Sequence, residues 1–188
     1  MPTPGTGQFA AKQLEFVRGW FDINAVAFSA KLSSSVTVAL GQGRCVSLNS
    51  SGEFVTGCLG RQMPMWLMTA TDAEDVATSD AGQNYIIGKP TGELTAITAK
   101  HACELATTEF DTAQTYVPNE FLRAVNADTN ATTGGRLTNQ GVVYITNTPL
   151  NWTAVVGRVS KPAAKRASDR NLVLRFWPAD NLPGAAGL

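Results

Sequence analysis

The stretch Arg44-Cys45-Val46-Ser47-Leu48-Asn49-Ser50-Ser51-Gly52-Glu53-Phe54-Val55-Thr56 decides the fold class. Two short segments with strand-forming residues, 44–48 and 53–56, flank four small polar residues. Asn49 and Gly52 readily adopt the backbone angles that a tight turn requires. The stretch therefore predicts a β-hairpin.

Further short strands are predicted on both sides of this hairpin. Residues 36–40 alternate between larger and smaller side chains, which is the period of a half-buried strand. Residues 63–69 form an apolar run in which Met65 and Leu67 face one way and Trp66 and Met68 the other, so a strand buried on both faces is expected. Residues 119–125 fit a short helix or a strand. The remaining predicted strands are 85–88, 93–98, 104–110, 115–117, 141–146, 153–160 and 171–177.

This pattern predicts a mainly β protein, either an antiparallel β-barrel or a sandwich of jelly-roll-like kind, with few short helices. Strands do not alternate with long helices, which argues against a parallel α/β sheet. No internal repeat is evident in the sequence. We divide the 188 residues into an N-terminal arm (1–35), a β-rich domain (36–180) and a C-terminal tail (181–188).

The proposed arm differs in composition from the rest of the chain. Proline and glycine within residues 1–7 favour an extended lead-in. Large apolar side chains follow, and leaving them in water costs about 25 cal/mol per Å² of apolar surface. One hypothesis is that they bind a neighbouring subunit, and the alternative is a first strand or helix that packs on the chain's own core. The candidate partner-binding residues are Phe9, Leu14, Phe16, Trp20 and Phe21.

Charge and cysteine content exclude several classes of function. The chain has 15 basic and 15 acidic residues, so its net charge attracts neither nucleic acid nor an anionic membrane. Cys45, Cys58 and Cys103 lack CxxC spacing, and buried free thiols are favoured over a bridge between Cys45 and Cys58. No secretion signal or apolar run of about 20 residues is evident, so synthesis in a cytoplasm is expected.

Enzyme motifs are incomplete. Residues 82–89 resemble a phosphate-binding loop but place five residues between the glycines, and Pro90 follows where Ser or Thr is needed. Gly41-Gln42-Gly43 is interpreted as a turn. His101 is the only histidine, and the carboxylates within 72–80 lack the spacing of a calcium loop. We therefore expect no catalytic residues, no metal and no cofactor.

One cluster of charge stands out near the C-terminus. Five basic residues lie within thirteen positions, with Asp169 as the only acid among them: Arg158, Lys161, Lys165, Arg166 and Arg170. A basic loop of this kind can dock on an acidic partner, where exposed charge sets the association rate and the register. The alternative is a hairpin tip that only keeps the protein soluble. Arg158, Lys161, Lys165 and Arg166 are the second set of candidate partner-binding residues.

Three stretches together resemble phage virion structural proteins of the capsid decoration, or cement, type. They are residues 43–54, residues 103–111 with 116–122, and residues 155–160 with 172–178. The resemblance implies a β-rich protein, often a homotrimer, that binds the outside of an icosahedral capsid in the virion. Its implied partners are the major capsid protein and copies of itself, and the family has no catalytic residues to carry over.

Two other classes of function compete with this hypothesis. A phage head-fibre protein or a receptor- or carbohydrate-binding β module would use exposed aromatic side chains as a flat platform. Trp20, Trp66 and Trp152 are the candidates for such a platform, and Trp152 lies in a predicted loop. An enzyme with an unrecognised site is the third class.

Overall fold

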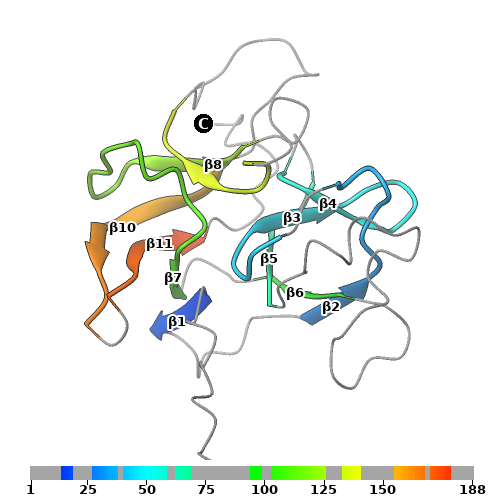
Figure 1. Ribbon diagram of the computed structural model, residues 1–188, viewed down its shortest axis with the longest axis horizontal. Coiled ribbons are helices and arrows are strands. Elements are labelled where there is room, and N and C mark those ends of the chain that lie inside the picture. The colour runs from blue at the N-terminus through cyan, green and yellow to red at the C-terminus, as the bar shows by residue number, and fades with distance from the viewer. Residues whose placement is uncertain are drawn as a thin grey trace, which may run out of the picture.

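The computed structural model describes residues 14–18, 27–37, 40–58, 62–68, 94–98, 103–125, 133–140, 155–167 and 170–178. Within these residues the protein is mainly β and contains no helix. The strands form two antiparallel sheets, which lie side by side in Figure 1. The mainly β, antiparallel prediction is confirmed. The sheets are consistent with a sandwich and are not closed into a barrel.

Five strands form one sheet and six the other. The five-stranded sheet has the order β2-β6-β5-β3-β4, and the six-stranded sheet has the order β1-β7-β11-β10-β8-β9. The strands of the first sheet are β2 (Ala27–Ala30), β3 (Cys45–Leu48), β4 (Phe54–Thr56), β5 (Met65–Leu67) and β6 (Leu94–Ile97). Those of the second are β1 (Leu14–Arg18), β7 (Glu104–Thr107), β8 (Phe121–Ala124), β9 (Leu137–Thr138), β10 (Val155–Lys165) and β11 (Leu172–Pro178).

The hairpin predicted from residues 44–56 is confirmed as β3 and β4. The Asn49 side-chain oxygen accepts hydrogen bonds from the amides of Ser51 and Glu53, each at 2.9 Å. Gly52 has φ = 77°, a left-handed conformation that glycine adopts without steric cost. The turn residues therefore fix the register of the hairpin, as the sequence indicated.

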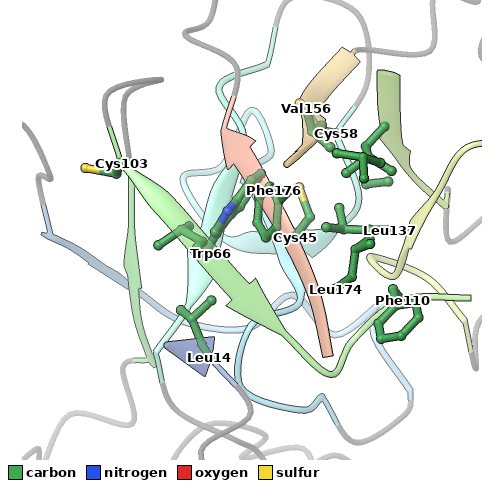
Figure 2. Packing of buried hydrophobic residues seen from close by; sticks show 14 of the residues in the cluster. Leu14, Cys45, Cys58, Trp66, Cys103, Phe110, Leu137, Val156, Leu174 and Phe176 are labelled. Carbon is green, nitrogen blue, oxygen red and sulfur yellow. The ribbon is translucent and has the colours of Figure 1, made fainter. Parts of the chain in front are cut away.

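Two hydrophobic clusters cover opposite faces of the five-stranded sheet. Met65 and Leu67 lie in the smaller cluster, whereas Trp66 lies in the larger one and Met68 packs against it. The prediction of a strand buried on both faces is therefore confirmed for β5. The larger cluster also contains Leu105, Leu122, Val159, Leu174 and Phe176 of the six-stranded sheet, so it joins the two sheets. Figure 2 shows Trp66 and Phe176 within it.

Two local predictions differ from the structure, and one that was left open between helix and strand is decided. Residues 33–36 form a turn closed by a hydrogen bond from the Val36 amide to the Ser33 carbonyl (2.9 Å), not the start of a strand. Val36 and Leu40 are nevertheless buried in the smaller cluster. Residues 115–117 are not a strand, and the 119–125 segment resolves to strand β8 and not to a helix. Burial was predicted better than backbone conformation here, because a turn can bury apolar side chains as well as a strand can.

The division at residue 35 does not match the structure. Strand β1 pairs with β7, Leu14 is 5% exposed within the larger cluster, and Phe16 packs against that cluster. Strand β2 belongs to the five-stranded sheet. Residues 14–18 and 27–35 are thus part of the β-rich domain, which corrects the arm hypothesis for Leu14 and Phe16. Phe9, Trp20, Phe21 and the 181–188 tail lie outside the described residues.

The structure contains a repeat that the sequence does not reveal. Strands β2–β6 and strands β7–β11 have the same topology: the first strand pairs with the fifth, the fifth with the fourth, the fourth with the second, and the second with the third. All these pairings are antiparallel. In each half, a residue after the first strand forms a parallel bridge to the third strand, Leu32 to Phe54 and Phe110 to Leu137. We call residues 27–97 the N-unit and residues 104–178 the C-unit.

Backbone hydrogen bonds match the two units residue by residue. The amide of Gly43 donates to Leu67 (2.7 Å), and in the C-unit the amide of Asn119 donates to Val159 (2.9 Å). Gly43 and Asn119 both have positive φ, at 90° and 74°. Each lies two residues before the second strand of its unit. Asparagine tolerates this conformation better than most residues, so the geometry is kept although the residue differs.

A second glycine pair tests the packing between the units. Gly135 matches Gly52, with φ of 80° and 77°. A Cβ at Gly135 would lie 2.5 Å from the Cys45 carbonyl oxygen, whereas a Cβ at Gly52 would have no atom within 4 Å.

We expect Gly52→Ala to lower the free energy of unfolding by about 1–2 kcal/mol through backbone strain alone. Gly135→Ala should cost at least about 2 kcal/mol more because of the added clash. Urea denaturation measures both, and equal losses would contradict the close contact.

Candidate functional site

A buried ion triad joins the two units. Arg44 Nε lies 2.8 Å from Glu109 Oε2, and Arg136 Nε lies 3.4 Å from the same oxygen. Arg44 also donates through Nη1 to the Gly134 carbonyl (3.0 Å). The Arg44 and Glu109 side chains are 5% and 10% exposed, and that of Arg136 is 37% exposed. A charge this buried needs a partner, so the triad constrains how the C-unit sits on the N-unit.

Backbone contacts surround the triad. The Cys45 amide donates to the Gly135 carbonyl (2.9 Å), and the Thr107 hydroxyl donates to the Gly43 carbonyl (3.4 Å). The C-unit therefore presents its β8–β9 turn (133–136) and the segment after β7 to the beginning of β3. None of these pairings has a sequence signal, because the partners lie far apart along the chain.

One row of the N-unit lies against the C-unit. Cys45, Trp66 and Ile97 are neighbours across β3, β5 and β6, and all three are buried in the larger cluster. The Trp66 and Phe176 ring centroids are 5.4 Å apart (Figure 2). We call these three residues the covered row. Trp66 is 2% exposed, so it cannot serve as a carbohydrate platform. Trp20 and Trp152 lie outside the described residues.

The matching row of the C-unit is partly open to solvent. Phe121, Arg158 and Trp177 are neighbours across β8, β10 and β11, and we call them the open row. Arg158 is exposed, and its guanidinium carbon lies 4.1 Å from the Phe121 ring centroid, which is a cation–π contact. Phe121 and Trp177 are half-buried. Arginine and aromatic residues are enriched in protein interfaces.

The predicted basic cluster lies on the β10–β11 hairpin. Lys161, Lys165 and Arg170 are exposed, and Arg166 Nη1 lies 2.9 Å from Glu15 Oε2 of β1. The structure therefore brings the four candidate residues Arg158, Lys161, Lys165 and Arg166 onto one hairpin. Residues 155–178 contain six basic residues and one acidic residue, whereas the rest of the chain contains nine and fourteen. The hairpin thus carries a net charge of +5 on an otherwise acidic protein.

The cysteine thiols are buried, and the other groups considered for catalysis or metal binding lie outside the described residues. None of the three cysteines forms a disulfide, and all three are buried. Burial raises the pKa of the Cys58 thiol to about 12 and also raises that of Cys45, with the neighbouring Cys58 as a second cause. These shifts favour the unreactive thiol form. His101, the carboxylates of 72–80 and the loop 82–89 lie outside the described residues.

The described segments hold no group of three or more His, Cys, Asp or Glu side chains that could bind a metal ion. They also contain no helix that is long and apolar enough to cross a membrane.

Removing the carboxylate of the triad should be much more costly than removing a surface one. Glu109→Ala leaves the buried Arg44 guanidinium without its ion partner, and we expect a loss of about 3–5 kcal/mol in unfolding free energy. Glu15→Ala removes a carboxylate that is 40% exposed and is one ion partner of Arg166, and its expected cost is about 0–1 kcal/mol. Chemical denaturation at neutral pH compares the two variants. Similar losses would contradict the role of the triad.

The buried thiols predict a loss of stability at alkaline pH. The unfolded Cys58 thiol loses its proton near pH 9.0, whereas the folded one keeps it up to about pH 12. Between these values the folded state binds more protons, so the free energy of unfolding falls as pH rises, by up to about 1.4 kcal/mol per pH unit for each thiol. Denaturation at pH 8, 9 and 10 should show a shallower fall for Cys58→Ala than for the unaltered protein. An identical pH dependence would contradict this assignment.

Comparison with known proteins gives no match: no protein-family model, curated protein or solved structure is similar to this chain.

Proposed function

We propose that this protein is a non-enzymatic virion structural protein that binds the outside of an icosahedral phage capsid and stabilises contacts between major capsid subunits. The protruding, basic β10–β11 hairpin is the observation that carries the proposal. The sequence resemblance to capsid decoration proteins supports the identity of the partner. The major capsid protein and copies of the chain itself, as a homotrimer, are the proposed partners.

The hairpin extends beyond the strands beside it. Strand β8 pairs with β10 only over Val155–Arg158, and β7 pairs with β11 only over Leu174–Phe176. The described hairpin residues 161–167 and 170–172 lie past these pairings, at the edge of the molecule in Figure 1. Such an element can insert its side chains into a partner surface without disturbing the core.

The turn of the hairpin is also held in place. The Arg166–Glu15 pair ties it to β1, and Arg170 donates its amide to the Arg166 carbonyl (2.9 Å) within the turn. Arg170 adopts φ = 59°, an uncommon conformation for a residue other than glycine. A pre-organised hairpin loses less conformational entropy on binding than a loose loop does, which favours a binding role over a purely solubilising one.

Charge reversal on the hairpin tests the proposal. We expect Lys161→Glu with Lys165→Glu to weaken binding to capsids that lack this protein at least about tenfold, mainly through slower association. The matched control, Lys161→Arg with Lys165→Arg, keeps the charge and should bind normally. Binding is measured by co-sedimentation with purified capsids at two salt concentrations, because screening should weaken it further.

The outcomes separate two parts of the proposal. Normal binding by the charge-reversed variant would reject the hairpin as the contact. No binding of the unaltered protein to capsids would reject the capsid as the partner. Deletion of residues 1–30 is unsuitable as a test, because Leu14 and Ala30 are buried in the two clusters and their removal disrupts the fold.

A further inference from the structure

We propose that copies of this chain associate head to tail, with the open row of one C-unit bound to the β3–β4 turn of the next copy's N-unit. This proposal rests on the proposed association of the chain with copies of itself, and it names the two surfaces through which those copies meet. A second copy of this chain is the expected partner of the open row, because the matching row of the N-unit is already covered by a unit of the same topology.

The contact between the units is heterologous. The N-unit contributes its covered row and the residues Gly43–Cys45, whereas the C-unit contributes its β8–β9 turn, Glu109 and the apolar face of its sheet that includes Phe176. Each unit thus has two contact surfaces. The row side carries the covered or open row, and the turn side carries the turn between the second and third strands of the unit. Within one chain, the row side of the N-unit and the turn side of the C-unit are used. The row side of the C-unit and the turn side of the N-unit remain, and heterologous contacts of this kind continue into rings or filaments.

The two remaining sides are partly or fully open to solvent. In the N-unit turn, Ser50, Ser51 and Gly52 are exposed, and the space around Gly52 is open where its match Gly135 touches the other unit. On the row side of the C-unit, Val117 is 53% exposed, the highest value for a large hydrophobic residue in the described part of the chain. It immediately precedes Pro118 and Asn119, which are also exposed. An exposed valine beside aromatic residues and an arginine fits a surface that a partner covers.

The charged residues of the triad have matches on these free sides. The carbonyl of Arg44 accepts from the amide of Leu67 (2.9 Å), and the carbonyl of Glu120 accepts from the amide of Val159 (2.8 Å). Arg44 and Glu120 each lie one residue before the second strand of their unit. Glu120 therefore stands on the row side of the C-unit where Arg44 stands on that of the N-unit.

The other two members match in the same way. The carbonyls of Glu109 and Lys31 each accept from the amide of the first residue in the third strand, at 3.0 and 2.8 Å. The carbonyls of Arg136 and Glu53 each accept from the amide that follows the second strand, at 2.8 and 2.9 Å. The C-unit turn side thus has Glu109 and Arg136 where the N-unit turn side has Lys31 and Glu53.

Every charge in the triad is inverted between the two interfaces. Glu120, Lys31 and Glu53 stand where Arg44, Glu109 and Arg136 stand in the contact within one chain. The proposed interface between copies therefore has complementary charges of the opposite signs. Lys31 is exposed, and no ion pair holds it among the described residues. The geometry points to an ion pair between Glu120 of one copy and Lys31 of the next.

The inversion also specifies which sides can meet. If the N-unit turn approached the covered row of another copy, Lys31 would face Arg44, and the C-unit turn would place Glu109 against Glu120 at the open row. Like charges held together at an interface disfavour the wrong pairing. N-units and C-units must therefore alternate along the assembly. A homotrimer closed in this way is a ring of six alternating units.

Zero-length cross-linking tests the predicted contact directly. Treatment of the full-length protein with a carbodiimide should condense the Lys31 amine with the Glu120 carboxylate, with loss of water, and join two chains by an amide bond. Mass spectrometry of the covalent dimer should find a peptide that contains both residues. Covalent oligomers joined only at other positions would overturn the proposal, and so would a protein that stays monomeric in sedimentation at high micromolar concentration.

Charge exchange gives a second, independent readout. Lys31→Glu should weaken self-association at least about tenfold in sedimentation, and adding Glu120→Lys should restore it. Glu120 also accepts bonds from the Val117 amide and the Asn139 side chain, so Glu120→Lys can affect folding. Ser51→Trp on the exposed N-unit turn therefore serves as a further variant, which should block association by bulk. Unchanged self-association of both Lys31→Glu and Ser51→Trp would reject the proposed surfaces.

Lys165→Glu is the matched control for these variants. It makes the same charge change on an exposed lysine of the hairpin, so it should leave self-association unchanged while weakening capsid binding. If the unaltered protein self-associates but does not bind capsids, the capsid proposal fails. If it binds capsids but does not self-associate, the head-to-tail proposal fails. A loss of self-association by Lys165→Glu equal to that of Lys31→Glu would contradict the Lys31 contact.

Discussion

The ion triad of Arg44, Glu109 and Arg136 constrains the arrangement of the whole molecule. Two guanidinium groups share one carboxylate oxygen at 2.8 and 3.4 Å. Because Arg44 is almost fully buried, its charge is tolerated only where Glu109 reaches it. Glu109 follows the first strand of the C-unit, and Arg44 precedes the second strand of the N-unit. The orientation of one unit on the other is therefore fixed by a few short polar contacts within a largely apolar boundary.

A heterologous contact between two units of the same topology has a geometric consequence. A two-fold interface would use the same surface of both units and leave nothing unmatched, whereas this contact uses different surfaces and leaves one of each exposed. The covered row is apolar, with Cys45, Trp66 and Ile97. The open row has Phe121, Arg158 and Trp177 instead, a composition that remains in water and still offers aromatic area to a partner.

Local features of the fold were predictable because short-range interactions cause them. The β3–β4 hairpin depends on Asn49 and Gly52, which act within four residues, and the two-faced burial of β5 follows from its alternating side chains. The basic hairpin was also evident as a cluster in the sequence. The N-terminal arm was wrong for Leu14 and Phe16, because an apolar segment has the same composition whether it packs on its own sheet or on a neighbour.

The repeat could not be predicted, because the two units keep backbone geometry and not residue identity. Gly43 is matched by Asn119, Leu32 by Phe110, and the charges of the triad are reversed. Each site requires only a positive φ, an apolar volume or a complementary charge, and different residues satisfy each requirement.

The sequence by itself determined the strand content, the tight turns and the basic hairpin, which arise from interactions between residues close along the chain. The tertiary structure alone decided which rows are covered and which charges meet, because those partners, such as Arg44 and Glu109, are brought together only by the packing of one unit against the other.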